Sequence, residues 1–137
     1  MKYKAPWWLP GGNLQTIWAA LRAERYVGDA PIFRRERWMT PDDDFVDVDF
    51  SDHASQPNAP LLVVFHGLEG SSGSHYAQAL TDAARARGWA CAVPHFRGCS
   101  GALNHGPRAY HSGDFEEIDW ILRRFKSQHP GPLMAVG

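Results

Sequence analysis

The chain has 137 residues, which suits one small domain and is too short for two of ordinary size. Hydrophobic residues make up 44% of it and charged residues 21%, and the 14 basic and 15 acidic side chains leave a net charge of −1. This composition excludes a disordered or collagen-like chain. The balanced charge predicts neither nucleic acid nor an anionic membrane as a partner.

The N-terminus and the cysteines bear on the compartment. Residues 1–12 open with two lysines, but Pro6, Pro10 and a glycine pair interrupt any apolar signal segment. No apolar run approaches the roughly 18–20 residues that cross a bilayer, so we expect neither an export signal nor a transmembrane segment. The spacing of Cys91 and Cys99 fits neither a Cys-x-x-Cys pair nor a zinc knuckle. We therefore expect two reduced thiols in a cytoplasmic protein.

A helix near residues 13–23 is the first element that the sequence predicts. Asn13 is expected to cap it. Four apolar residues recur there at helical spacing: Leu14, Ile17, Trp18 and Leu21.

A β-hairpin is expected next. Residues 33–40 and 45–50 are rich in β-forming residues, and a Pro-Asp-rich turn separates them. The second segment alternates apolar residues with Asp47 and Asp49. This alternation predicts an antiparallel hairpin with one solvated face.

Strands and helices alternate in the rest of the chain. Three continuous apolar runs are typical of strands that are buried on both faces: residues 61–65, 89–93 and 133–136. Helical spacing predicts one helix over residues 74–87 and another from Phe115, with Ser112 or Asp114 as its cap. This order is typical of an α/β protein, in which parallel strands are joined by crossover helices.

These elements suggest three parts of one partial domain. Residues 1–30 would form an N-terminal helical extension, and residues 31–60 the hairpin and a loop. Residues 61–137 would form a parallel βαβαβ unit.

A glycine-rich loop follows the first buried strand: His66-Gly67-Leu68-Glu69-Gly70-Ser71-Ser72-Gly73. A dinucleotide-binding loop needs Gly-x-Gly-x-x-Gly, which this spacing lacks, and a P-loop needs a lysine that is missing here. In a third interpretation, a His-Gly turn after the central strand of a serine hydrolase aims the next N–H at an oxyanion. That N–H belongs to Leu68.

Three motifs in the chain are characteristic in their order and spacing. They are Leu9-Pro10-Gly11-Gly12-Asn13-Leu14-Gln15-Thr16-Ile17, His66-Gly67-Leu68-Glu69-Gly70-Ser71 and Pro94-His95-Phe96-Arg97-Gly98-Cys99-Ser100-Gly101. They resemble the α/β-hydrolase superfamily, and more closely its YheT-like branch of predicted esterases. The resemblance covers essentially the whole chain and implies the N-terminal half of that fold. It also implies a serine esterase or lipase-like activity on small acyl esters, without a metal or organic cofactor. Leu68 would supply an oxyanion-hole N–H, in a loop shaped by His66 and Gly67.

The catalytic triad is the part that the sequence lacks. By resemblance, the serine belongs to a Gly-x-Ser-x-Gly elbow after the third buried strand, with an aspartate and a histidine later in the chain. Gly137 looks like the first glycine of that elbow. The other two loops do not fit the motif, because Ser74 and Ala102 stand where its last glycine is required. We therefore expect half of an oxyanion hole, no triad residue, and no activity of this chain alone.

Two polar groups could suggest metal sites. The spacing of His95, His105 and His111, near Asp114, matches no compact ligand pattern, so solvated loop histidines are favoured. The three aspartates at residues 42–44 lack the alternate spacing and distal glutamate of a calcium loop. A solvated turn is the favoured interpretation.

Two other groups have a structural and a functional interpretation. Arg97 and Asp119 could pair to brace a loop, or could be ordinary surface residues. The N-terminal apolar residues could wall an acyl pocket or rest on a membrane surface: Trp7, Trp8, Leu9 and Trp18. We favour their packing of the N-terminal helix onto the edge of the sheet.

Two other functional classes stay open. The chain could be a noncatalytic remnant or an interaction module, because the strand starting at Leu133 would form an open apolar edge. Such an edge predicts self-association or a docked partner. A nucleotide-binding α/β protein is the less favoured third alternative.

Overall fold

The structure is a computed structural model that describes residues 4–22, 26–52, 54–68, 70–111 and 113–137. Its elements follow the chain in this order: α1 (Gly12–Arg22), β1 (Arg34–Met39), β2 (Phe45–Ser51), β3 (Leu61–Val64), α2 (His75–Ala86), β4 (Ala90–Pro94), α3 (Phe115–Gln128) and β5 (Leu133–Val136). The strands form a five-stranded sheet in the order β1-β2-β4-β3-β5.

The sheet is mixed, as the sequence predicts. β2 pairs antiparallel with β1 and with β4, whereas β3 lies parallel to both β4 and β5. Helices α2 and α3 connect the parallel strands, because parallel neighbours need a crossover connection. The α/β class, with a hairpin followed by parallel strands and crossover helices, is confirmed.

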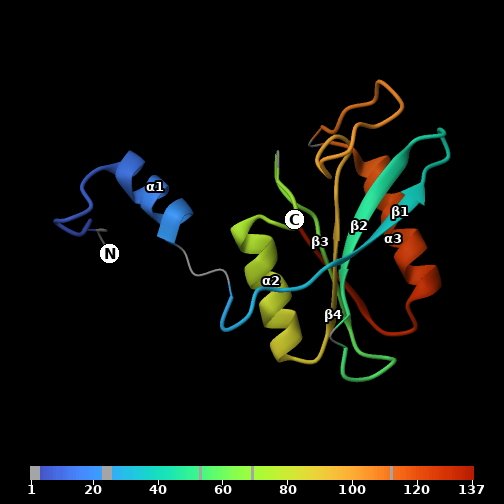
Figure 1. The fold of residues 1–137 in the computed structure, drawn as a ribbon, viewed down its shortest axis with the longest axis horizontal. Helices are drawn as coiled ribbons and strands as arrows, with labels where there is room; N and C mark the ends of the chain where they lie inside the picture. Colours follow the sequence, from blue (N-terminus) through green and yellow to red (C-terminus); the bar gives the residue numbers. More distant parts are fainter. Residues whose placement is uncertain (1–3, 23–25, 53, 69, 112) are drawn as a thin grey trace.

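The hydrophobic core lies on both faces of the sheet, with α2 on one side and α3 on the other (Figure 1). On the α3 face, Ile121 and Phe125 are buried against the sheet, and the ring centroids of Phe125 and Trp38 are 4.9 Å apart. On the opposite face, Ala77 and Ala84 of α2 are buried against β3 and β4. Coverage of both faces explains the uninterrupted apolar runs of β3 and β4.

The helix starts differ slightly from those expected. α1 begins at Gly12, so Asn13 lies inside the helix and not at its cap. Asp114 caps α3 by accepting a hydrogen bond from the Glu117 N–H. The other expected cap, Ser112, lies outside the described residues.

The expected solvated face of the hairpin is wrong. Asp47 and Asp49 of β2 are both buried, because β2 has a neighbour on each side and arginines of β1 cover its polar face. Arg35 lies directly opposite Asp49 in the β1–β2 register, and Arg37 lies opposite Asp47. Each arginine donates two hydrogen bonds to its aspartate, at distances of 2.6 to 2.8 Å.

The expected packing of the N-terminal helix onto the sheet edge is also wrong. α1 stands apart from the sheet and from α2 and α3 (Figure 1). Trp7, Trp8 and Trp18 remain exposed as a result. In the part of the chain that the structure describes, no helix is long and apolar enough to cross a membrane.

Candidate functional site

The candidate site lies where the parallel strands β3 and β5 end. The Phe65 N–H, just after β3, donates to the Val136 carbonyl at 2.8 Å. A Cβ atom on Gly137 would lie 3.3 Å from the Cβ of Phe65. The residues after both strands therefore emerge side by side, at the sheet edge where ligands of open α/β sheets bind.

His66, the first residue of the loop, is held in one neutral tautomer. Its Nε2 accepts a hydrogen bond from the Phe96 N–H at 3.1 Å, so Nδ1 carries the proton and donates to the Gly67 carbonyl at 2.8 Å. Burial lowers the pKa of His66, and the nearby His95 lowers it further, against the effect of the Gly67 carbonyl. Both ring nitrogens are engaged with the backbone, which supports a loop-shaping role.

Tyr76 of α2 anchors the next turn of the loop. Its hydroxyl oxygen accepts a hydrogen bond from the Gly67 N–H at 2.7 Å. The Gly70 N–H closes the turn by donating to the Gly67 carbonyl at 2.9 Å. A Cβ atom on Gly70 would lie 2.7 Å from the Tyr76 hydroxyl and 2.9 Å from the Gly67 carbonyl oxygen. The loop therefore requires glycine at position 70.

Leu68 stands between these two fixed points. The residue is 82% exposed, and its N–H donates to no residue within the described ranges. The N–H groups of Gly67 and Gly70 are engaged, so Leu68 offers the unused donor between them. This is the residue to which the sequence assigns an oxyanion-hole N–H.

The serines after this turn serve the loop itself. Ser74 accepts a hydrogen bond from the Ser71 N–H at 3.0 Å, and the Ser71 hydroxyl accepts one from the Gly73 N–H at 3.1 Å. The Ser72 hydroxyl is buried and donates to Asp49 at 2.6 Å. No serine among the described residues donates to a histidine, so a nucleophile–base pair is not formed there.

Asp49 is the centre of a buried polar cluster behind the loop. Its Oδ2 accepts a hydrogen bond from His95 Nε2 at 2.9 Å and another from the Ser72 hydroxyl. Burial raises the pKa of Asp49, but hydrogen bonds from Arg35, His95 and Ser72 outweigh it and hold the pKa well below the usual range. Because the aspartate lies between the serine and the histidine, this order is not that of a catalytic triad. The cluster fixes the loop after β4 against β2.

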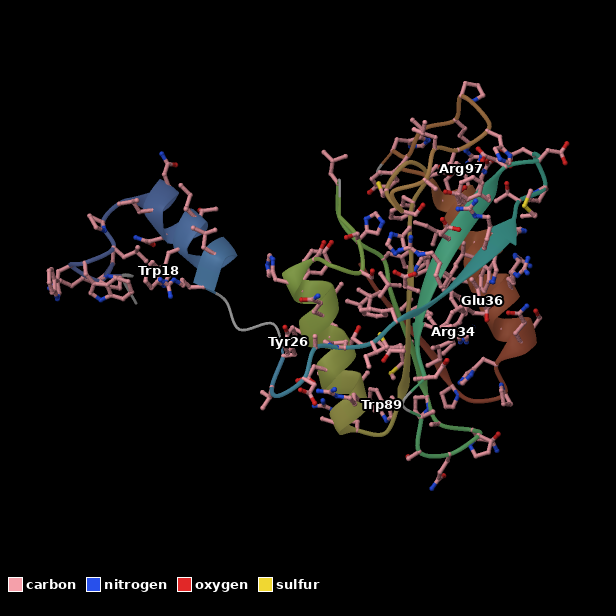
Figure 2. All side chains as sticks on the ribbon, viewed as in Figure 1. Trp18, Tyr26, Arg34, Glu36, Trp89 and Arg97 are labelled. Carbon is pink, nitrogen blue, oxygen red and sulfur yellow. The ribbon has the colours of Figure 1, made fainter. Side chains whose placement is uncertain are left out.

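A second buried cluster surrounds Arg97, between the hairpin and α3 (Figure 2). Its guanidinium donates to Glu117 at 2.6 Å, to Asp42 at 2.7 and 2.9 Å, and to Asp44 at 3.2 Å. Of the two interpretations left open for Arg97 and Asp119, their pairing is wrong, and the surface interpretation holds for Asp119 but not for the buried Arg97. Asp119 pairs with the exposed Arg123 one helical turn away on α3, because it lies on the solvent side of that helix.

The aspartate turn and the loop histidines are less solvated than expected. Asp44 is buried, whereas Asp42 and Asp43 are exposed. His95 is buried against Asp49, while His105 and His111 are exposed. Within the described ranges, no three or more His, Cys, Asp or Glu side chains gather as they would around a metal ion.

Sequence reasoning missed Tyr76 and Asp49 as residues that support the site. Tyr76 is one of several apolar residues on the α2 stripe, and no sequence signal marks its hydroxyl as a loop anchor. Asp49 had a usable signal. Alternate arginines precede the hairpin turn and alternate aspartates follow it, and a hairpin register places such residues opposite each other.

Comparisons with known proteins concern the sequence and the fold of the chain. No model of a known protein family matches the chain. Over 127 residues the chain is 49% identical to an Escherichia coli (strain K12) protein described as "Putative esterase YheT". The match covers 91% of this chain but 36% of that protein, so the chain spans about a third of the length of its curated relative.

A solved structure gives independent support for the fold. An alpha-beta serine hydrolase homologue from Coxiella burnetii superposes with a TM-score of 0.56 at 15% sequence identity. The superposition covers 76% of this chain and 51% of the other. The strand order, the superposition and the sequence match show that these residues form an N-terminal part of an α/β-hydrolase fold, with a sequence similar to that of the putative esterase YheT.

Proposed function

We propose that this chain forms part of a serine hydrolase that cleaves carboxylic esters, and that its own chemical contribution is one half of the oxyanion hole. The observation that carries the proposal is the Leu68 N–H. Leu68 is exposed, and its N–H has no partner among the described residues, in a loop that His66 and Tyr76 hold in place. The relationship to a YheT-like protein supports the ester substrate.

The chemistry follows from what an ester hydrolysis requires. Attack of a serine on the ester carbonyl places negative charge on the carbonyl oxygen, and a preorganised N–H stabilises that charge. In this proposal the Leu68 N–H is one donor, and the N–H after an elbow serine is the other. The serine and its histidine and aspartate would come from residues beyond the present sequence.

The chain alone is accordingly proposed to be inactive, because it supplies a donor but no activated nucleophile. Neither a metal nor an organic cofactor has a role in the proposed mechanism. The proposal includes a cytoplasmic location, which rests on the number and spacing of the cysteines.

The test compares this chain with the longest protein that the same reading frame encodes. A fluorophosphonate probe and p-nitrophenyl butyrate measure the nucleophile and the ester hydrolysis. We expect labelling and turnover in the longer protein only. Labelling of the 137-residue chain, or a longer protein that hydrolyses no ester, would contradict the proposal.

The role of Leu68 is tested in the longer protein by Leu68→Pro, which removes the N–H. Loss of one oxyanion donor lowers kcat by about 100-fold to 1,000-fold, with a smaller effect on KM. Leu103→Pro, in another exposed loop, is the matched control and is expected to keep kcat. Equal kcat values for the two variants would exclude Leu68 as an oxyanion donor.

A further inference from the structure

The N-terminal segment presents an apolar surface to solvent. Five residues form this tryptophan surface: Trp8, Leu14, Ile17, Trp18 and Leu21. Leu21 is 75% exposed, and Trp7 beside the surface is 91% exposed. Contiguous exposed apolar side chains of this kind mark an interaction site.

The tryptophan surface is a single face of one structural unit. Four of its residues recur at helical spacing along one side of α1. Trp8 joins them from the preceding turn, since its ring meets that of Trp18 edge-on at a centroid distance of 5.2 Å. The Leu9 N–H donates to the Pro6 carbonyl at 3.0 Å, and Gln15 Nε2 donates to the Leu9 carbonyl at 3.2 Å. These bonds fix the turn against the helix.

The sequence of residues 1–23 carries charge of one sign. Residues 1–23 contain Lys2, Lys4 and Arg22 but no aspartate or glutamate. The Arg22 guanidinium lies over the Trp18 ring, 5.3 Å from its centroid. A basic group at the rim of an apolar face can reach lipid phosphates while the face enters the bilayer interface.

The position of α1 leaves the surface accessible. α1 stands apart from the sheet (Figure 1), and Trp18 lies on it well away from Trp89 and the labelled residues of the sheet (Figure 2). The described strands and the helices α2 and α3 leave the apolar side chains of this surface exposed.

We infer that the tryptophan surface docks α1 onto the interfacial region of an anionic lipid bilayer, with the helix lying in the membrane plane. Tryptophan favours this region because its ring is apolar and its N–H is polar. The absence of acidic side chains in residues 1–23 suits anionic headgroups, although the whole chain has a balanced charge. The inference is independent of the proposed ester hydrolysis.

Flotation of the full chain with lipid vesicles in a density gradient tests the inference. Vesicles of phosphatidylcholine alone are compared with vesicles that also contain phosphatidylglycerol. We expect the chain to float with the anionic vesicles and to be released by salt. Aggregated protein sinks, so flotation distinguishes binding from self-association.

Variants assign the binding to the tryptophan surface. Trp18→Ser is expected to lower the partition coefficient between water and vesicles about tenfold or more, because the variant lacks the apolar ring whose transfer out of water favours binding. Leu103→Ser removes an exposed apolar side chain from the body of the protein and is the matched control, expected to bind as the parent does. Replacing Lys2, Lys4 and Arg22 by glutamine is expected to abolish the preference for anionic vesicles. Circular dichroism checks that each variant is folded.

Two outcomes would overturn the inference. One is a folded chain that floats with neither vesicle type. The other is flotation that Trp18→Ser and Leu103→Ser reduce equally. A dimer that Trp18→Ser dissociates, without flotation, would assign the surface to a second copy of the chain.

Discussion

Arg97 is buried with three carboxylates around its guanidinium, so its removal would leave Asp44 and Glu117 buried without their cation. We predict that Arg97→Met lowers the free energy of unfolding by about 3–5 kcal/mol, because breaking a buried ion pair strands the remaining charge. Urea unfolding, followed by circular dichroism at neutral pH, measures this change.

Arg123→Met is the matched control for Arg97. Arg123 pairs with Asp119 across one turn of α3, but both side chains are largely exposed. Water solvates both charges whether or not they meet, so this substitution should leave the urea midpoint almost unchanged. If both variants lost a similar amount of unfolding free energy, the burial of the Arg97 cluster would not explain its contribution to stability.

Asp44 should make the fold sensitive to acid. Burial raises its pKa, but hydrogen bonds from the His105 N–H, the Asn104 amide and further backbone N–H groups lower it to about 2. The folded-state pKa is thus below the ordinary aspartate value of 3.8, so the stabilisation by the Asp44 carboxylate is present above that value. It is lost as the pH falls from 3.8 towards 2.

The test is the unfolding free energy of Asp44→Asn and of the parent chain as a function of pH. The variant should be less stable at neutral pH, and the difference should shrink over that acid window. Glu117 acts in the opposite direction. Burial raises its pKa, so its contribution weakens as the pH rises above its unfolded value and cannot cause the acid loss. A difference that stays constant with pH would contradict the assignment to Asp44.

At the scale of elements, the sequence predicts most of the sheet because burial on both faces leaves a direct pattern. The runs that became β3 and β4 contain almost no polar residue, and both strands are largely buried. The run that became β5 has the same pattern, but its expected burial on both faces is wrong, because β5 is an edge strand and Ala135 and Val136 are exposed on it. The prediction for β2 was wrong because alternating apolar and polar residues show that the two faces of a strand differ. They do not show that the polar face is exposed to solvent. Its aspartates are buried by charge pairing with β1, which is a property of two strands and not of one.

The candidate site likewise contains residues that the sequence predicts and residues that it does not. The unused N–H of Leu68 follows a local motif, so the sequence indicates it. The anchors of the loop do not, because the Tyr76 hydroxyl reaches Gly67 only once α2 has packed against β3 and β4. Contacts that depend on tertiary packing leave no periodic signal in the chain.

The loop after β3 should tolerate a methyl group at Gly67 but not at Gly70. A Cβ atom on Gly70 would lie under 3 Å from the Gly67 carbonyl oxygen, the His66 Cβ and the Tyr76 hydroxyl. We predict that Gly70→Ala destabilises the fold by about 1–3 kcal/mol through this overpacking. Gly67→Ala has an ordinary contact of 3.8 Å to Tyr76 and should cost about 0.5 kcal/mol or less.

Urea unfolding of the two alanine variants checks this prediction. The substitutions share a loop and a chemical change, so their difference isolates the close approach at Gly70. Equal midpoints would mean that the loop relaxes around a Cβ atom at little cost and is not held by its anchors.

For the whole molecule, the two edges of the sheet differ in chemistry. β1 carries three arginines and a glutamate among its six residues, and charged side chains deter pairing with another strand. β5 has the sequence Leu-Met-Ala-Val, and Ala135 and Val136 are exposed on it. β5 pairs with β3 on one side, and its other side is an edge of the sheet.

We therefore predict that this chain self-associates through β5 and that Ala135→Lys reduces the association. A lysine on the edge must be desolvated when a second strand pairs there, which opposes the pairing. Natural edge strands carry lysine for this reason. Size-exclusion chromatography with light scattering, over a range of protein concentrations, gives the molar mass. Met39→Lys, on the already charged β1 edge, is the matched control and should associate as the parent does. If both variants remain associated, β5 is not the contact, and Trp18→Ser then tests whether the tryptophan surface is.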